Sequence, residues 1–160
     1  FLGLPSLRDA NENDKISLLA TQFIGNPADG VNPANGVWGV TAPLPDIGVL
    51  LPSEVQEIQT LLATANGAIA GSVPEGWALF DLHGLYNEVV TTGVFEDDFN
   101  MTGDLVFGGF FSLDGFNPTS RGSALIAKRM LAAIDATYGS NLSEAGLDIG
   151  DYPTNYPDGI

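Results

Sequence analysis

A capped helix followed by a short apolar run is the feature that most limits the fold of this chain. Ser53-Glu-Val-Gln56 has the pattern of a capping box, and apolar residues then recur at helical spacing, which predicts a helix over residues 53–70. After a glycine- and proline-containing turn comes Trp77-Ala-Leu-Phe80. Because this run is apolar on both faces, it predicts a buried strand of the parallel-sheet kind. A helix followed by such a strand is half of a βαβ unit, so the expected fold class is α/β.

Two further helices are expected in the second half of the chain. A short helix is predicted to follow Asp81-Leu-His83-Gly84 and to run through Val90. The closing helix is predicted to begin near Pro118-Thr119 and to reach Tyr138, with Gly139 as its C-terminal cap. Both helices would lie close in sequence to candidate functional residues.

The stretch before the closing helix contains a further strand signal. Leu105-Val-Phe107 and Phe110-Phe111 are apolar and flank Gly108-Gly109. Glycine inside a strand pattern often marks a bulge or a bend, so we expect a bent strand or a hairpin edge here.

The chain is expected to form one domain with a tail. Residues 1–142 would be the domain, and residues 25–52, dense in Gly, Pro and Asn, would be a long loop added to it. Residues 143–160 contain no basic side chain and carry Tyr152-Pro153 and Tyr156-Pro157. They predict an extended acidic tail that lies on the body of the protein or on a neighbour.

Charge and composition exclude several classes of function. The 20 acidic and 5 basic residues give a net charge of −15, which disfavours nucleic acid and anionic membranes as partners. The chain has no cysteine, which excludes disulfides, thiolate metal sites and a cysteine nucleophile. No apolar run is long enough to predict a membrane-spanning helix. With 44% hydrophobic residues the chain has enough apolar material for a packed core.

The run Phe111-Ser-Leu-Asp114-Gly-Phe-Asn117-Pro118-Thr119, directly before the closing helix, contains the main candidate for chemistry. An acid on a sharp turn ahead of a helix is able to orient an imidazole, whose other nitrogen then activates a serine hydroxyl. The same residues are also those that an ordinary turn and helix start prefer, so on chemistry alone a purely structural turn is the preferred interpretation of this run.

This run resembles the last sequence block of the SGNH/GDSL hydrolases, in which an Asp and a His three residues later serve a distant Ser. Residues 105–141 carry the resemblance best, and a looser similarity to bacterial secreted or lipoprotein-type members begins at Asn13-Asp14. The resemblance implies the C-terminal part of a flavodoxin-like three-layer α/β/α fold, a parallel sheet flanked by helices. It also implies that Asp114 is the catalytic acid and that Asn117 occupies the position of the family's His.

The chain departs from the family pattern at the other catalytic residues. It has no Gly-Asp-Ser block for a nucleophile, and Ser72 and Asn13-Asp14 are expected to be loop residues. A carboxamide does not titrate near neutral pH, so Asn117 is not competent as a base, although it would keep the hydrogen bonding of the turn. His83 is the only histidine and is expected to be a surface or packing residue.

Three hypotheses about function follow. The first is the C-terminal portion of a serine ester hydrolase of the esterase or lipase type, without its nucleophile and inactive by itself. The second is a non-catalytic SGNH-like subunit of an extracellular or outer-envelope assembly in a bacterium. The third is an unrelated small-ligand binding domain. In the first two, another protein chain or a missing N-terminal segment would complete the sheet.

No cofactor or metal is expected. Scattered acidic residues offer oxygen ligands for a hard cation, but they lack the regular spacing of a calcium loop, so a solvated acidic surface is the preferred interpretation. These residues are Asp46, Glu96, Asp97, Asp98, Asp104, Asp148, Asp151 and Asp158.

Overall fold

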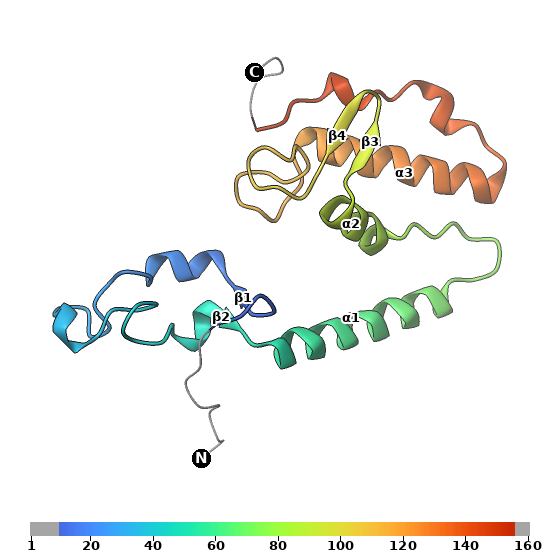
Figure 1. Ribbon diagram of the computed structural model, residues 1–160. Helices are drawn as coiled ribbons and strands as arrows, with labels where there is room; N and C mark the ends of the chain where they lie inside the picture. Colours follow the sequence, from blue (N-terminus) through green and yellow to red (C-terminus); the bar gives the residue numbers. More distant parts are fainter. Residues whose placement is uncertain (1–9, 156–160) are drawn as a thin grey trace. The chain divides into compact units, whose positions relative to one another are not determined.

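The computed structural model describes residues 10–155 and divides into two compact units, residues 1–71 and 72–160 (Figure 1). The described elements of the first unit are β1 (Lys15–Ile16), η1 (Leu18–Gln22), η2 (Pro33–Asn35), η3 (Asp46–Gly48), β2 (Val49–Leu50) and α1 (Pro52–Ser72), whose last residue belongs to the second unit. The described elements of the second unit are α2 (Leu82–Thr91), β3 (Val94–Glu96), β4 (Phe99–Met101), α3 (Ser120–Tyr138), η4 (Leu142–Ala145) and η5 (Ile149–Asp151).

The first unit has little buried interior among its described residues. Strands β1 and β2 pair antiparallel, with Lys15 opposite Leu50 and Ile16 opposite Val49. Ala20 is fully buried, and a β-carbon added to Gly48 would lie 3.2 Å from the Ala20 β-carbon, so a side chain at position 48 would require Ala20 to shift slightly. Residues 25–51 contain the 3-10 turns η2 and η3, strand β2 and isolated β-bridges.

Helix α1 matches the helix predicted over residues 53–70, although its cap differs from the prediction. The helix begins at Pro52, a position that suits proline because the first amide of a helix has no intrahelical partner. The backbone amide of Leu51 donates to Glu54 Oε2 at 2.7 Å, which is half of a capping box shifted ahead of Ser53 and Gln56. None of the 21 residues of α1 is buried.

Both helices predicted in the second unit are confirmed. Helix α2 is capped by Asp81, whose carboxylate accepts from the Gly84 amide at 2.8 Å. Helix α3 is capped by Thr119, whose side-chain oxygen accepts from the Gly122 amide at 2.9 Å. It ends at Tyr138 and is followed by the C-cap Gly139, whose φ of 64° is the left-handed conformation that glycine adopts without strain.

The hairpin of the second unit forms at residues 94–101, so the expectation of a bent strand or hairpin edge over residues 105–111 is wrong. Strands β3 and β4 pair antiparallel through a tight turn at Asp97 and Asp98, whose φ values are 45° and 66°. Two successive residues of positive φ match the right-handed twist of a hairpin. Residues 105–111 instead fold back as a loop, and a β-carbon on Gly108 would lie 2.4 Å from the Thr102 carbonyl oxygen.

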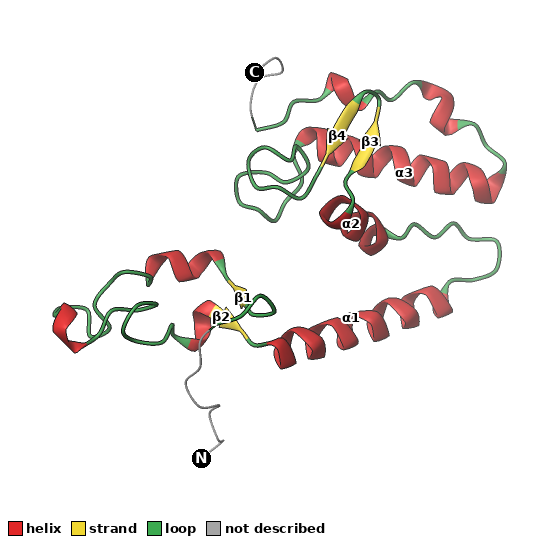
Figure 2. Cartoon of the chain, in the orientation of Figure 1, coloured by secondary structure: helices red, strands yellow, loops and turns green. Residues whose placement is uncertain are grey.

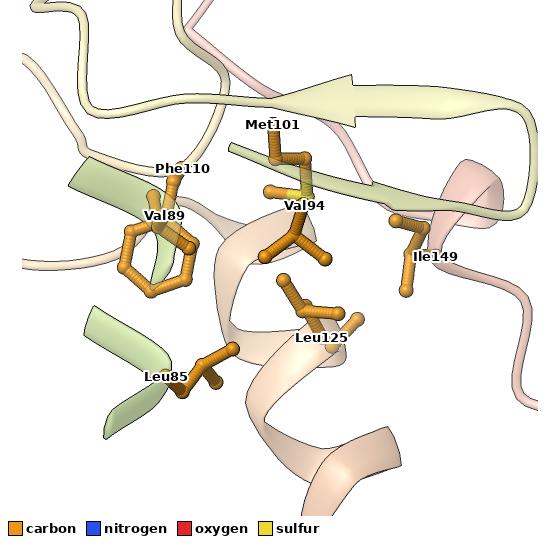
Figure 3. Close-up of a cluster of buried hydrophobic side chains, with 8 residues drawn as sticks. Leu85, Val89, Val94, Met101, Phe110, Leu125 and Ile149 are labelled. Atoms are coloured by element: carbon orange, nitrogen blue, oxygen red, sulfur yellow. The ribbon is translucent and has the colours of Figure 1, made fainter. Parts of the chain in front are cut away.

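The core of the second unit collects side chains from α2, the hairpin, α3 and the C-terminal segment (Figure 3). Its buried members are Leu85, Val89, Val94, Met101, Phe110, Ala124, Leu125 and Ile149. At one side the rings of Tyr86, Phe110 and Phe111 meet edge to face, with centroids 5.0–5.7 Å apart. Burial of these side chains fixes the start of α3 against the loop that carries Asp114.

The structure is mixed α/β, as expected, but it is not a flavodoxin-like fold. Both sheets among residues 10–155 are two-stranded and antiparallel, so the predicted parallel sheet flanked by helices is wrong for this part of the chain. The predicted strand at residues 77–80 is drawn as loop between α1 and α2 (Figure 2). A strand exists only with a hydrogen-bonded neighbour, and no described segment pairs with this run.

Candidate functional site

The Asp114 turn is a closed loop at the entrance to α3. The backbone amide of Ser112 donates to the Asn117 carbonyl at 2.7 Å, and the amide of Gly115 donates to the Ser112 carbonyl at 2.9 Å. Gly115 has a φ of 68°, which explains why glycine is suited to this position. The turn therefore holds residues 112–117 in a defined geometry directly before the helix.

The Asp114 carboxylate is the hydrogen-bond acceptor at the centre of this turn. Its Oδ1 accepts from Ser112 Oγ at 2.6 Å and from the backbone amides of Phe116 and Asn117 at 2.8 and 2.9 Å. Its Oδ2 accepts from Asn117 Nδ2 at 2.7 Å. The residue three positions after the acid thus contacts the acid through its side chain.

These donors change the acidity of Asp114. The Ser112 hydroxyl, the Phe116 amide and both donors of Asn117 stabilise the charged form and hold the pKa of Asp114 well below its usual range. A carboxylate with so low a pKa is a poor proton acceptor near neutral pH. Chemically, this arrangement orients a donor at position 117 and does not itself remove a proton.

The start of α3 is held by hydrogen bonds to Gly109 and Phe110, which precede the turn. Buried Thr119 donates its hydroxyl to the Gly109 carbonyl at 2.7 Å, and its amide donates to the Phe110 carbonyl at 2.8 Å. A β-carbon on Gly122 would lie 2.5 Å from the Phe110 carbonyl oxygen, so only glycine fits there. The direction in which α3 leaves the Asp114 turn is therefore fixed by backbone contact.

Arg121 joins the start of α3 to the C-terminal segment. Its side chain is buried, and its Nε donates to the carbonyls of Ile149 and Tyr152 at 3.2 and 3.0 Å. Its backbone amide donates to the Pro153 carbonyl at 3.1 Å. Its guanidinium lies over the ring of Phe99.

The C-terminal segment also contacts the base of the Asp114 turn. Asn155 Nδ2 donates to the Phe111 carbonyl at 2.7 Å. Ile149 is fully buried in the core, so residues 149–155 pack on the body of the second unit. The pair Tyr156-Pro157, expected to mediate contacts of the tail, lies outside the described residues.

The other sequence candidates do not join Asp114 through any described contact. His83 is exposed on α2, and its ring nitrogens lie 3.2 and 3.5 Å from Asn87 Nδ2 one turn along the same helix. Ser72 is the last residue of α1, so the expectation that it is a loop residue is wrong. Asn13 and Asp14 form a polar turn in the first unit, in which the Asn11 amide donates to Asp14 Oδ2 at 2.7 Å.

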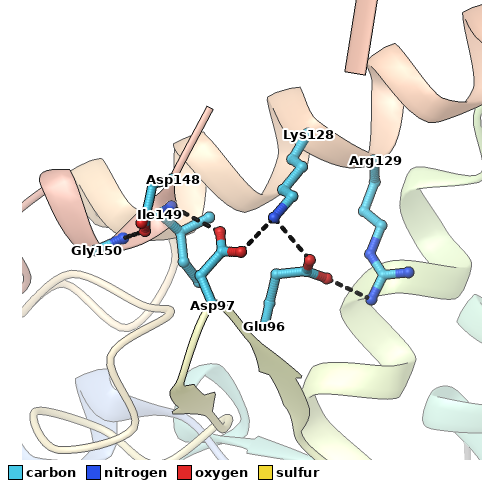
Figure 4. Close-up of polar contacts among 7 residues, drawn as sticks. All are labelled: Glu96, Asp97, Lys128, Arg129, Asp148, Ile149 and Gly150. Carbon is cyan, nitrogen blue, oxygen red and sulfur yellow. Dashed lines mark hydrogen bonds and ion pairs between the residues drawn. The ribbon is translucent and has the colours of Figure 1, made fainter. Parts of the chain in front are cut away.

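The acidic residues of the hairpin turn form an ion-pair cluster with α3 (Figure 4). Lys128 Nζ lies 2.8 Å from Glu96 Oε1 and 2.5 Å from Asp97 Oδ1, and Arg129 lies 3.3 Å from Glu96 Oε2. Asp97 Oδ2 also accepts from the Ile149 amide at 3.0 Å. Hydrogen bonds from Lys128 and then from Ile149 lower the pKa of Asp97.

The pKa of Lys128, the basic partner of Asp97 in this cluster, shifts in the opposite direction. Burial alone would lower the pKa of Lys128, but the hydrogen bonds to Asp97 and Glu96 outweigh it and raise that pKa above 10.5. Within residues 10–155 no group of three or more His, Asp or Glu side chains is placed to hold a metal ion. The carboxylates of Glu96 and Asp97 pair with the Lys128 ammonium group. Asp158 lies outside the described residues.

Arg121 is an organising residue that the sequence patterns did not single out, and Asp97 is one that they indicated only as a scattered acidic residue. The sequence contains a weak signal for each of them. Basic residues are scarce in this chain, with 5 in all, so a basic residue at the first turn of a helix has few substitutes. The Asp-Asp pair at residues 97–98, between two short apolar runs, is a hairpin-turn pattern.

No family model matches this chain, and neither a curated protein nor a solved structure matches it. Among the helices in residues 10–155, none has both the length and the apolar character that crossing a bilayer requires.

Proposed function

We propose that this chain is the C-terminal portion of an SGNH/GDSL-like serine ester hydrolase and that it is inactive by itself. The observation that supports this most is the 2.7 Å hydrogen bond from Asn117 Nδ2 to Asp114 Oδ2 on the turn before α3. An acid with a side-chain donor three residues later, ahead of a closing helix, is the arrangement that orients a catalytic imidazole. A histidine at position 117 would donate to Asp114 in the same place.

The same geometry explains why the chain alone would lack activity. An asparagine at position 117 has no nitrogen that accepts a proton near neutral pH. Ser112 donates its hydroxyl directly to Asp114, whose lowered pKa makes it unable to activate that hydroxyl as a base would. The nucleophile and the base would have to come from another polypeptide segment, and the substrate would be an ester.

A second candidate function is a non-catalytic subunit of the same family type in a protein assembly. Helix α1 favours this candidate, because none of its residues is buried. Its apolar side chains Ile58, Leu61 and Ile69 are each at least half exposed. Such a face is typical of a surface that another protein covers. We place the protein, in either case, outside the cell or at the outer envelope of a bacterium.

The first test is ester turnover by the chain alone. We expect no hydrolysis of p-nitrophenyl acetate above the buffer rate and no labelling by a fluorophosphonate probe, because no serine–base pair is formed by the described residues. Turnover with covalent labelling of a serine of this chain would contradict the proposed inactivity.

The second test restores the missing base. In a polypeptide that includes the coding sequence upstream of Phe1, Asn117→His is expected to raise esterase activity about 100-fold, the contribution of a positioned general base. Asn141→His, in an exposed turn after α3, is the matched control and should leave the rate unchanged. Equal rates for both variants would count against Asp114 as a catalytic acid.

A further inference from the structure

The run from Trp77 to Phe80 is held in place at both ends by the second unit. The Trp77 amide donates to the Pro74 carbonyl at 3.1 Å, and the Ala78 amide donates to the Tyr138 hydroxyl at 3.1 Å. At the other end Phe80 packs against the buried core. This segment is therefore positioned by the fold, although it belongs to no helix or strand.

Burial alternates along this run with the period of a β-strand. Ala78 and Phe80 are half-buried, whereas Trp77 is 67% exposed and Leu79 is 48% exposed. None of the four residues has a positive φ. Alternation with a period of two indicates an extended segment with one face on the core. The outer face carries two large apolar side chains, so it has the composition of a buried face.

The backbone of this segment has an open edge. Among the described residues, the Leu79 amide finds no hydrogen-bond acceptor, and the carbonyls of Trp77 and Leu79 accept no hydrogen bond. In an extended chain the amide and carbonyl of one residue point to the same edge as those of the residue two positions away. The unpaired groups on this edge are therefore the Leu79 amide and the carbonyls of Leu79 and Trp77, whereas the Trp77 amide is bonded to the Pro74 carbonyl. On the other edge the Tyr138 hydroxyl accepts from the Ala78 amide.

We propose that residues 77–80 are a docking edge for a β-strand of a different polypeptide, one with apolar side chains and basic residues at its ends. Unpaired backbone groups beside apolar side chains are satisfied by an added strand, whereas a helix or a lipid surface leaves them unpaired. Leu79 would exchange both backbone hydrogen bonds with the incoming strand. The open edge exists whether or not Asp114 belongs to a catalytic triad.

The charged residues beside this segment indicate which kind of partner strand would bind. Glu75 and Asp81 flank the segment and are both exposed, so basic residues at the ends of the partner strand would be attracted to them. A second copy of this chain is a poor occupant, because antiparallel pairing of the two edges would bring Asp81 of each copy close to Glu75 of the other. The partner is therefore a strand of different sequence.

The test uses the full chain labelled with ¹⁵N and a synthetic peptide, Lys-Lys-Val-Ile-Val-Ile-Lys-Lys. Hydrogen exchange of the Leu79 amide is expected to slow about tenfold in the presence of excess peptide, because the amide gains a hydrogen bond. The peptide Glu-Glu-Val-Ile-Val-Ile-Glu-Glu should leave this exchange rate unchanged. An unchanged Leu79 rate with the lysine peptide, or equal slowing by both peptides, would overturn the proposal.

Two variants separate strand docking from loose apolar adsorption. Leu79→Pro removes the donor at the open edge and should abolish the peptide-induced chemical-shift changes at residues 77–80. Leu113→Pro is the matched control, because Leu113 is also exposed and occupies the second position of a turn, which suits proline. It should bind the peptide like the parent chain. Binding that survives Leu79→Pro, or protection of Leu79 by self-association without peptide, would overturn the proposed occupant.

Discussion

The guanidinium carbon of Arg121 lies 3.9 Å from the centroid of the Phe99 ring. The same side chain donates to two carbonyls of the C-terminal segment, so one buried charge links α3, β4 and residues 149–152. The face of an aromatic ring and carbonyl oxygens both stabilise a buried cation. These three segments are expected to lose stability together when Arg121 is changed.

Arg121→Met is therefore expected to destabilise the second unit by about 3 kcal/mol, because the carbonyls of buried Ile149 and of Tyr152 lose a charged donor and the stacking on Phe99 is lost. Urea unfolding followed by circular dichroism measures this change. Arg129→Met is the control, since the Arg129 side chain is 40% exposed and pairs only at the surface with Glu96. It should cost less than about 1 kcal/mol. Equal losses for the two variants would show that Arg121 does not link the segments.

Asp97 is expected to make stability depend on acid pH. Its pKa is lowered in the folded state from 3.8, first by the hydrogen bond from Lys128 and then by that from Ile149. A depressed pKa stabilises the fold fully above the unfolded value, and this stabilisation is lost as the pH falls toward the folded value. Asp97→Asn should thus cost about 2 kcal/mol at pH 7 and progressively less below about pH 4.

The measurement is the unfolding free energy of the parent chain and of Asp97→Asn across this acid range. Asp98→Asn is the neighbouring control, because Asp98 occupies the same turn with a similar left-handed backbone but contacts neither Lys128 nor Ile149. A difference between the parent chain and Asp97→Asn that stays constant from neutral to strongly acid pH would argue against the ion pair as its cause.

Gly122→Ala is expected to disturb the junction between the Asp114 turn and α3. The added β-carbon would lie 2.5 Å from the Phe110 carbonyl oxygen, so the backbone must shift, at a cost of about 2–3 kcal/mol. Gly67→Ala in α1 is a matched helical control, with no atom within 4 Å of its added β-carbon. It should stabilise α1 by about 0.5–1 kcal/mol. Thermal unfolding followed by circular dichroism compares the two, and a neutral Gly122→Ala would mean that the helix start is not tightly packed.

Ile149→Ala should show that the C-terminal segment belongs to the folded unit. Ile149 is fully buried in the core, so its truncation leaves a cavity and is expected to cost about 2–4 kcal/mol. Leu142→Ala is the control, because Leu142 is 45% exposed in the preceding 3-10 turn. Limited proteolysis after residue 147 should also become faster in Ile149→Ala. Comparable stability of the two variants would indicate a loosely attached tail.

The sequence alone determined the features that depend on neighbouring residues. The sequence predicts three helices close to those that form at residues 52–72, 82–91 and 120–138, because caps, apolar spacing and a terminal glycine act within a few residues. The turn at Asp114 was likewise visible, since Asp, Gly, Asn and Pro favour turns through their own backbone and side-chain preferences. The capping of α1 by Glu54 in place of Gln56 differs from the prediction by a shift within the same turn.

Only the tertiary structure decided the features that depend on distant partners. The run at residues 77–80 has a strand composition, yet it forms a strand only if a neighbouring strand pairs with it, and no described strand does so. Arg121 acquired its role from carbonyls 28 and 31 residues away, which no local pattern encodes. Local preferences determine the helices and turns, because the interactions that stabilise them join residues only a few positions apart. Strand pairing and burial depend instead on segments that come into contact only when the chain folds.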